Sequence, residues 1–213
     1  MSSTTGKPLG LVFFPAFDWA ISPTHPEREE RLLFTRDQVL EEGLLDLPQI
    51  REYKPRLASM ADLERVHIGV PDIASLITDA HRVSAGGAIT AAESVLRGET
   101  ARAFALVRPP GHHAMRVVHG TRGFCAVNIE AVMIESLRKK YGLRRVAIVD
   151  TDVHHGDGTQ DIYYHDPDTL FISFHQDGRT LYPGTGFPIE AGSPAALMST
   201  VNIPLPPGTT DAG

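Results

Sequence analysis

The stretch Arg145–Asp161, RVAIVDTDVHHGDGTQD, decides the fold class of this chain. It begins with an apolar run, Val146–Val149, whose length and β-branched content predict a strand buried on both faces. Polar and small residues then follow from Asp150 to Asp157 almost without a break. In an open parallel sheet, ligands bind where the strands end, because side chains from neighbouring connections converge there. The stretch therefore predicts a site at the carboxyl end of a buried strand.

The spacing of the polar residues indicates a metal site. Asp150, Asp152 and His154 alternate along the chain, so in an extended segment they share one face. Two carboxylates and an imidazole this close need a cation or hydrogen-bond partners to compensate them. A mixed oxygen and nitrogen donor set suits zinc, with iron or manganese as alternatives, and argues against calcium. A polar loop with solvated aspartates is the competing interpretation of this motif alone.

A second polar cluster lies upstream, at 108–114, RPPGHHA, and it also follows an apolar run, Phe104–Val107. Proline fixes its own φ, and glycine permits φ values closed to other residues, so the adjacent His112 and His113 sit on a backbone bent at defined places. Near an Asp/His metal set, two imidazoles have the chemistry of a general base and a general acid. Two such loops, each after a predicted buried strand, favour one shared site over two unrelated polar loops.

These motifs carry a family resemblance. Together with GFCAVN at 123–128, SFHQ at 173–176 and YPGTG at 182–186, they resemble the zinc-dependent histone deacetylase family, which includes bacterial deacetylase-like amidohydrolases and acetylpolyamine amidohydrolases. The resemblance runs from about His25 to Gly213 and covers the first half to two thirds of the family's catalytic domain. It implies an arginase/deacetylase-like fold, incomplete on its C-terminal side, and zinc-dependent hydrolysis of an acetyl-lysine or acetylpolyamine amide.

The resemblance also implies roles for individual residues. It assigns the catalytic positions to His112, His113, Asp150 and Asp157, and the zinc ligands to Asp152 and His154. His113 would be the general base and acid, with His112 as its partner in electrostatic stabilisation. An imidazole that must hold one tautomer needs a partner on its far nitrogen, so Asp157 would orient His113 and Asp150 would orient His112.

Two further sites follow from the same resemblance. A narrow channel that grips the methylene stem of the substrate would be lined by Gly123, Phe124 and Tyr182. A structural potassium site would use backbone carbonyls around Asp150, Asp152 and His154 of the opening stretch. Ser173 and Phe174 of a later strand would complete it. His155 and His175 are expected to pack behind these sites.

Other family features have no counterpart in the sequence. The third zinc ligand, an aspartate, and a tyrosine that stabilises the oxyanion do not appear in their motif contexts, and no aspartate of segment 68–83 matches the one on the family's pocket rim. The competing hypothesis is therefore a catalytically incomplete, deacetylase-like chain that acts as a binding or interaction module. A dinuclear manganese site of the arginase kind is a further alternative, but it needs more ligands than the chain offers.

Length and periodicity predict the remaining architecture. The 213 residues, 42% of them hydrophobic, fit a single domain, 1–213. Helices are expected to alternate with strands, which predicts an α/β fold with a mostly parallel sheet flanked by helices. The strands are expected at 11–14, 104–107, 146–149, 169–174 and 201–205. The helices are expected at 28–42, 59–67 and 84–97, with a last one that has Val127 to Leu137 on its apolar face and ends at Lys139, Lys140 and Gly142.

Composition limits the partners. The net charge of −6 and the absence of Lys/Arg blocks give no electrostatic footprint for nucleic acid or an anionic membrane. A single cysteine, Cys125, excludes an internal disulfide and fits a reducing compartment. No leader or membrane-spanning pattern is evident, so a cytoplasmic location is expected. A parallel sheet that ends at an exposed edge invites association, so a homo-oligomer is one expected state.

Overall fold

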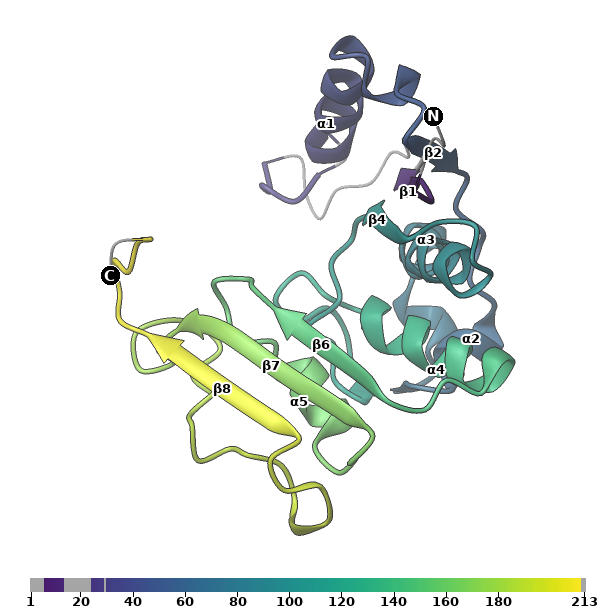
Figure 1. Ribbon diagram of the computed structural model, residues 1–213. Coiled ribbons are helices and arrows are strands. Elements are labelled where there is room, and N and C mark those ends of the chain that lie inside the picture. The colour runs from purple at the N-terminus through teal and green to yellow at the C-terminus, as the bar shows by residue number, and fades with distance from the viewer. Residues whose placement is uncertain (1–5, 14–23, 29, 212–213) are drawn as a thin grey trace.

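The computed structural model describes residues 6–13, 24–28 and 30–211. Its strands form two three-stranded sheets, and every strand pairs in parallel (Figure 1). The first sheet has the order β2-β1-β4, with β1 at Leu9–Phe13, β2 at Ile50–Tyr53 and β4 at Arg102–Leu106. The second has the order β6-β7-β8, with β6 at Val146–Asp150, β7 at Thr169–Gln176 and β8 at Thr200–Leu205. A short parallel pair joins β3, Ile68–Gly69, to β5, Val117–Val118. The predicted α/β class is confirmed, although the parallel strands are divided between sheets.

Five α-helices connect these strands within the described residues. They are α1 (Glu30–Glu41), α2 (Met60–Glu64), α3 (Asp79–Leu96), α4 (Ile129–Tyr141) and α5 (Asp157–Tyr163). A capping box between Ser59 and Asp62 starts α2, as the sequence predicts. Helix α3 begins five residues before the predicted Ser84, because Thr78 and His81 form a second capping box there. Three 3-10 turns, Leu44–Asp46, Ala74–Leu76 and Pro194–Ala196, complete the elements.

The main hydrophobic core lies where α3 and α4 pack together. Leu63, Ile89, Val127 and Val132 are fully buried there. Small residues let α3 approach its neighbours closely: a Cβ built on Gly86 would lie 1.9 Å from the Arg56 carbonyl oxygen. A Cβ on the next residue, Gly87, would lie 2.6 Å from Val107, so small residues also let α3 pack closely against the segment that follows β4.

Only one face of the second sheet is covered. Helix α5 lies behind β7 in Figure 1, and the β7 side chains on that side, including Phe171, are buried. On the opposite face Leu170 and Phe174 are exposed, and Val149 of β6 is 57% exposed. The prediction that Val146–Val149 is buried on both faces is therefore wrong, because no described element packs on that side.

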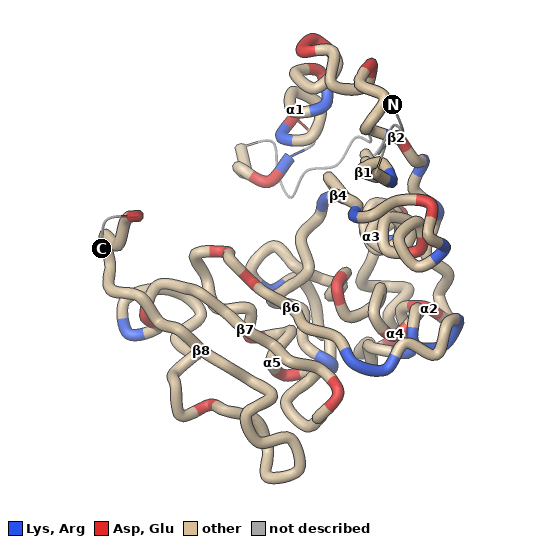
Figure 2. Tube along the Cα trace, in the orientation of Figure 1, with Lys and Arg blue, Asp and Glu red and all other residues tan. Residues whose placement is uncertain are grey.

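The first helix also departs from expectation. The sequence predicts an apolar face on α1, yet none of its described residues is buried. In Figure 1 it projects from the body of the molecule beside β1 and β2. Basic and acidic positions are interspersed along the chain trace (Figure 2). Among the described residues, no helix has the length and apolar content to cross a membrane.

Candidate active site

The loops that follow β4 and β6 meet at a cavity of about 780 Å³. Strands β4 and β6 belong to different sheets, yet the polar loops at their carboxyl ends line the same cavity, although they are about forty residues apart in sequence. Eight of the residues singled out from the sequence line this cavity: His112, His113, Gly123, Phe124, Asp150, Asp152, His154 and Tyr182. The other three, Asp157, Ser173 and Phe174, are not among the described lining residues.

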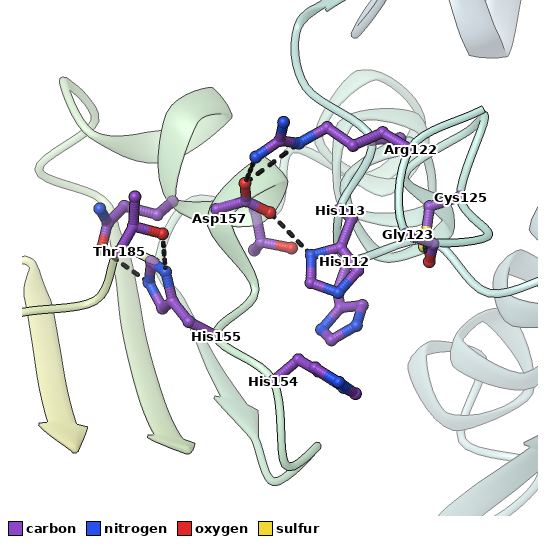
Figure 3. Close-up of polar contacts among 12 residues, drawn as sticks. His112, His113, Arg122, Gly123, Cys125, His154, His155, Asp157 and Thr185 are labelled. Carbon is purple, nitrogen blue, oxygen red and sulfur yellow. Dashed lines mark hydrogen bonds and ion pairs between the residues drawn. The ribbon is translucent and has the colours of Figure 1, made fainter. Parts of the chain in front are cut away.

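His113 is held by a buried carboxylate. Its Nδ1 lies 2.7 Å from Oδ1 of Asp157, the first residue of α5, and both side chains are almost fully buried. A carboxylate only accepts, so Nδ1 carries the proton and Nε2 keeps a free lone pair. The other oxygen of Asp157 accepts from the guanidinium of Arg122 (Figure 3). Asp157 thus fixes the ring orientation and tautomer of His113, as the sequence predicts.

His112 is held in the same way from β6. Its Nδ1 lies 2.9 Å from Oδ2 of Asp150, the last residue of that strand, so this ring also donates from Nδ1. The two imidazole rings are close neighbours, with centroids 4.0 Å apart. The second oxygen of Asp150 accepts the backbone N–H of Asp152 at 3.0 Å, which secures the carboxylate against rotation.

The two histidines differ in basicity. Burial opposes protonation of His112, but the hydrogen bond to Asp150 and the charges of Asp150 and Asp152 raise its pKa above the ordinary value. For His113 burial dominates, and it lowers the pKa despite the bond to Asp157. When two neighbouring groups have pKa values pushed apart, one can act as a cation and the other as a neutral base. Here His112 is the more basic group and His113 the neutral one. A bound dication would lower both values.

Asp152 and His154 have the donor types of a divalent metal site. His154 Nδ1 and Asp152 Oδ1 point at each other and are 2.9 Å apart. Two ligands on a tetrahedral zinc with bonds of about 2.0–2.1 Å are separated by about 3.3 Å, so the pair fits such an ion with a small outward shift. Burial raises the pKa of Asp152, but the backbone N–H of His154, the charge of His112 and the His154 ring together lower it below its ordinary value, which keeps the carboxylate ionised. Within the described residues, however, no group of three or more His, Cys, Asp or Glu side chains is arranged to hold a metal.

The three channel residues flank the two histidines. Gly123 has φ +51, and a Cβ there would lie 2.3 Å from Cδ2 of His113, so only glycine fits against that ring. Phe124 and Tyr182 are each 43% exposed, and the Tyr182 ring centroid lies 5.0 Å from that of His113. His25 packs edge-on against Phe124 at 4.5 Å. Aromatic walls beside the bases can receive an apolar chain.

The residues expected to bind potassium lie on the neighbouring strand. The β6–β7 register places Ser173 directly opposite Asp150. Ser173 is fully buried, and its hydroxyl lies 2.9 Å from Nδ1 of His175. Phe174 directs its ring to the exposed face of the sheet, so it can contribute to such a site through its backbone carbonyl. The register thus places the end of β6, from which Asp152 and His154 follow, beside the middle of β7, where Ser173 and Phe174 lie.

Two further polar residues of the site were not found from the sequence. Arg122 pairs with Asp157, and its guanidinium carbon lies 5.7 Å from the Tyr182 ring centroid. The sequence signal that could have identified Arg122 is its position directly before the Gly123–Phe124 motif. Glu130 lines the cavity, burial raises its pKa, and its Oε2 has no hydrogen-bond partner among the described residues. It stands in the first turn of a predicted helix, where an acid is unremarkable.

Comparison with known proteins places this site in a family. The family model for the histone deacetylase domain matches residues 72–213, which is most of the chain and includes the whole of the site from His112 to Tyr182. The chain belongs to the histone deacetylase family. Its resemblance to that family, inferred from the motifs, is thereby confirmed, and the fold and site can be set beside other members.

Several relatives in the histone deacetylase family are named for amide hydrolysis. A probable deacetylase from Archaeoglobus fulgidus is 47% identical over 210 residues, which cover 90% of this chain and 57% of that protein. A histone deacetylase-like amidohydrolase from Pseudomonas aeruginosa is 46% identical over 127 residues, or 60% of this chain and 33% of the relative. An acetylpolyamine amidohydrolase from Burkholderia pseudomallei is 44% identical over 130 residues, or 61% of this chain and 37% of the relative.

A solved structure of the same family supports the fold. The crystal structure of an HDA15 HD domain matches with a TM-score of 0.79 at 30% identity, covering 93% of this chain and 62% of that one. The chain therefore spans roughly a third to three fifths of the length of these relatives.

Proposed function

We propose that this protein takes part in the zinc-dependent hydrolysis of an acetylated amine, either acetyl-lysine or an acetylpolyamine. The observation that carries the proposal is the pair of His–Asp hydrogen bonds, at 2.7 and 2.9 Å, that open on the cavity lined by Asp152 and His154. The relatives named as deacetylases and amidohydrolases support the same class of reaction.

The residues of the chain divide the reaction among them. When bound by Asp152 and His154, zinc supplies Lewis-acid polarisation of the amide carbonyl and acidifies a water molecule. His113 accepts the proton of the attacking water at Nε2, because Asp157 holds the other ring proton at Nδ1. The same nitrogen then returns the proton to the departing amine. His112, kept basic by Asp150, stabilises the negative charge that develops on the carbonyl oxygen.

The channel supplies orientation. Phe124 and Tyr182 offer ring faces to the methylene chain of the acylated amine, and Gly123 leaves room between them for His113. Burial of that chain places the amide beside the two imidazoles and excludes bulk water other than the attacking molecule. Either an acetyl-lysine or an acetylpolyamine carries a stem of this kind.

A structural potassium ion is the second cofactor that we propose. Backbone carbonyls of Asp150, Asp152, His154 and Phe174, with the hydroxyl of Ser173, would hold it behind the zinc ligands. Support comes from the register that pairs Ser173 with Asp150 and from the full burial of Ser173. We further propose that the protein works in the cytoplasm, and that the uncovered sheet face and edge favour a homo-oligomer.

One observation favours a second candidate, a binding module without hydrolytic activity. The described residues supply two zinc ligands, whereas a catalytic zinc site usually takes three from protein. On the hydrolase proposal the third ligand lies outside the described residues. On the module proposal the cavity binds an acylated chain without turning it over.

Replacing His113 by Ala separates the two candidates. On the hydrolase proposal, turnover of an acetyl-lysine peptide by the zinc-loaded native product falls by about 10²–10⁴, the usual contribution of a general base. His165→Ala, which alters an exposed histidine outside the cavity, serves as the control and leaves turnover unchanged. If the wild type and His113→Ala both bind the acetylated peptide and neither hydrolyses it, the result would support the module.

A further inference from the structure

A polar cluster centred on two buried histidines lies beside the cavity and is not used by the proposed chemistry. It consists of His155, Gln160, His175, Thr185 and Glu190, and we call these five residues the loop latch. The two histidines are each 1% exposed, and their ring centroids are 4.8 Å apart. Neither is among the described residues that line the cavity. Figure 3 shows His155 turned away from His113 and toward Thr185.

The hydrogen bonds of His155 define its tautomer. The side-chain amide nitrogen of Gln160 donates to Glu190 at 2.6 Å, so Oε1 of Gln160 is its accepting atom. That oxygen lies 3.1 Å from Nε2 of His155, which must therefore carry a proton. Nδ1 then accepts from the hydroxyl of Thr185 at 2.8 Å. His155 is a neutral ring whose two nitrogens are both occupied.

His175 holds the next residue of the same segment. Its Nε2 lies 2.9 Å from the Gly186 carbonyl oxygen, which only accepts, so Nε2 donates and Nδ1 accepts from the Ser173 hydroxyl. Gly186 has φ +87, and a Cβ there would lie 2.4 Å from Nε2 of His175 and 2.6 Å from Cγ of His155. The backbone thus approaches both rings as closely as glycine allows.

Glu190 closes the cluster from the far side of the segment. Its carboxylate accepts the backbone N–H of Gly186 at 3.2 Å and that of Phe187 at 3.1 Å, besides the amide of Gln160. Three consecutive residues, 185–187, are therefore held by the side chains of His155, His175 and Glu190, and Gln160 of α5 joins His155 to Glu190. Buried polar networks whose members are all satisfied are rigid.

The fixed segment carries a wall of the cavity. Tyr182 lies three residues before Thr185, and its ring centroid is 5.0 Å from that of His113 and 6.1 Å from that of His154. His155 directly follows His154 in the chain. The loop latch therefore connects the segment that carries Tyr182 to the loop that carries the proposed zinc ligands.

We propose that His155 and His175 are positioning residues, which hold Tyr182 against His113 and thereby set how tightly the acyl chain of the substrate is bound. The proposal rests on the proposed function only for its effect on substrate. The effect on the segment itself is a property of this chain and can be measured without turnover.

The first test uses Thr185→Val, which keeps the side-chain shape but removes the hydroxyl that donates a hydrogen bond to His155. Losing this bond, with a buried nitrogen left unpaired, should speed hydrogen exchange at the Gly186 and Phe187 amides about tenfold. Thr185→Ser restores the hydroxyl and should exchange within about twofold of wild type. His175→Phe keeps an aromatic ring without a donor to Gly186, and should also speed exchange at these two amides.

Helix α1 provides the internal reference, because none of its described residues is buried. Its amides exchange through local openings that leave the loop latch intact, so their rates should be unchanged in Thr185→Val. Wild-type exchange at Gly186 and Phe187 in both Thr185→Val and His175→Phe would overturn the proposal. It would also be overturned by an equal acceleration in α1, since that result would show a general loosening of the fold.

The second test measures kinetics with the native, zinc-loaded product on an acetyl-lysine peptide. Thr185→Val should raise KM several-fold and leave kcat within about twofold, because a displaced wall weakens ground-state and transition-state binding alike. Thr185→Ser should restore the wild-type KM. An unchanged KM in Thr185→Val, despite faster exchange, would refute the link to substrate. Absence of turnover in the wild type would count against the proposed function and leave the exchange test to decide on the loop latch.

Discussion

Buried His67 makes the stability of the chain depend on pH in a way that can be worked out from its contacts. Its Nδ1 donates to the Met115 carbonyl at 2.9 Å, and its Nε2 accepts the N–H of Asn128, the N-cap residue of α4, at 2.9 Å. Protonation at Nε2 would break the second bond. Burial is the main cause that lowers the pKa of His67 to about 4 from an ordinary 6.5, against the raising effect of its backbone hydrogen bonds.

The sign follows from proton binding in the two states. Above pH 6.5 neither the folded nor the unfolded His67 binds a proton. Between pH 6.5 and about 4 the unfolded residue is protonated and the folded one is not, so the free energy of unfolding falls as the pH falls. Each pH unit in this window costs about 1.4 kcal/mol, and the whole window costs about 3 kcal/mol from this residue.

Urea unfolding at a series of pH values between 4 and 7.5 tests this account. His67→Gln keeps a donor and an acceptor but does not titrate, so its free energy of unfolding should fall about 3 kcal/mol less than that of wild type between pH 6.5 and 4. His81, whose pKa burial also lowers to about 4, remains in both proteins, so part of the pH dependence should persist. His119→Gln alters an exposed ring and should follow the wild-type curve. A wild-type pH dependence in His67→Gln would refute the reasoning.

Two other substitutions probe the site. In urea unfolding, Gly123→Ala should lower the free energy of unfolding clearly more than Gly142→Ala. Both glycines have φ above +50, and an alanine in that left-handed backbone costs about 1–2 kcal/mol in either place. Only the Cβ at position 123 would also collide with His113. Equal losses would contradict the contact. Arg122→Met should cost about 1–3 kcal/mol at pH 7 and move the pKa of Asp157 up toward its ordinary value, since burial and the lost guanidinium then both disfavour the carboxylate. An unchanged acid limb of the stability curve would argue against that pairing.

Local patterns were enough to predict strands β1, β4, β6, β7 and β8 and the site loops. The alternation of Asp150, Asp152 and His154 after an apolar strand placed all three beside one cavity, and the adjacent His112 and His113 lie in the same place. These signals work because strand period and strand polarity are local properties that survive folding. The geometry of the two His–Asp pairs followed from the roles implied by the family resemblance.

Features set by distant contacts were not predicted. Arg122 reaches Asp157 across thirty-five positions, and Glu190 reaches Gln160 across thirty. Neither contact leaves a periodic trace in the sequence. The exposed face at Val149 was missed for a similar reason, because an apolar strand indicates that a face can be covered, and only the tertiary arrangement shows whether it is. The short strands β2, β3 and β5 are too brief for an alternating pattern to appear.

The metal content of the native product tests the central claim most directly. The protein would be isolated from its source cells, dialysed, and analysed for metal in wild type, Asp152→Ala and His154→Ala. The account predicts one zinc per chain in wild type, and its loss in both variants. Two manganese ions per chain, or zinc that persists without Asp152 and His154, would contradict it.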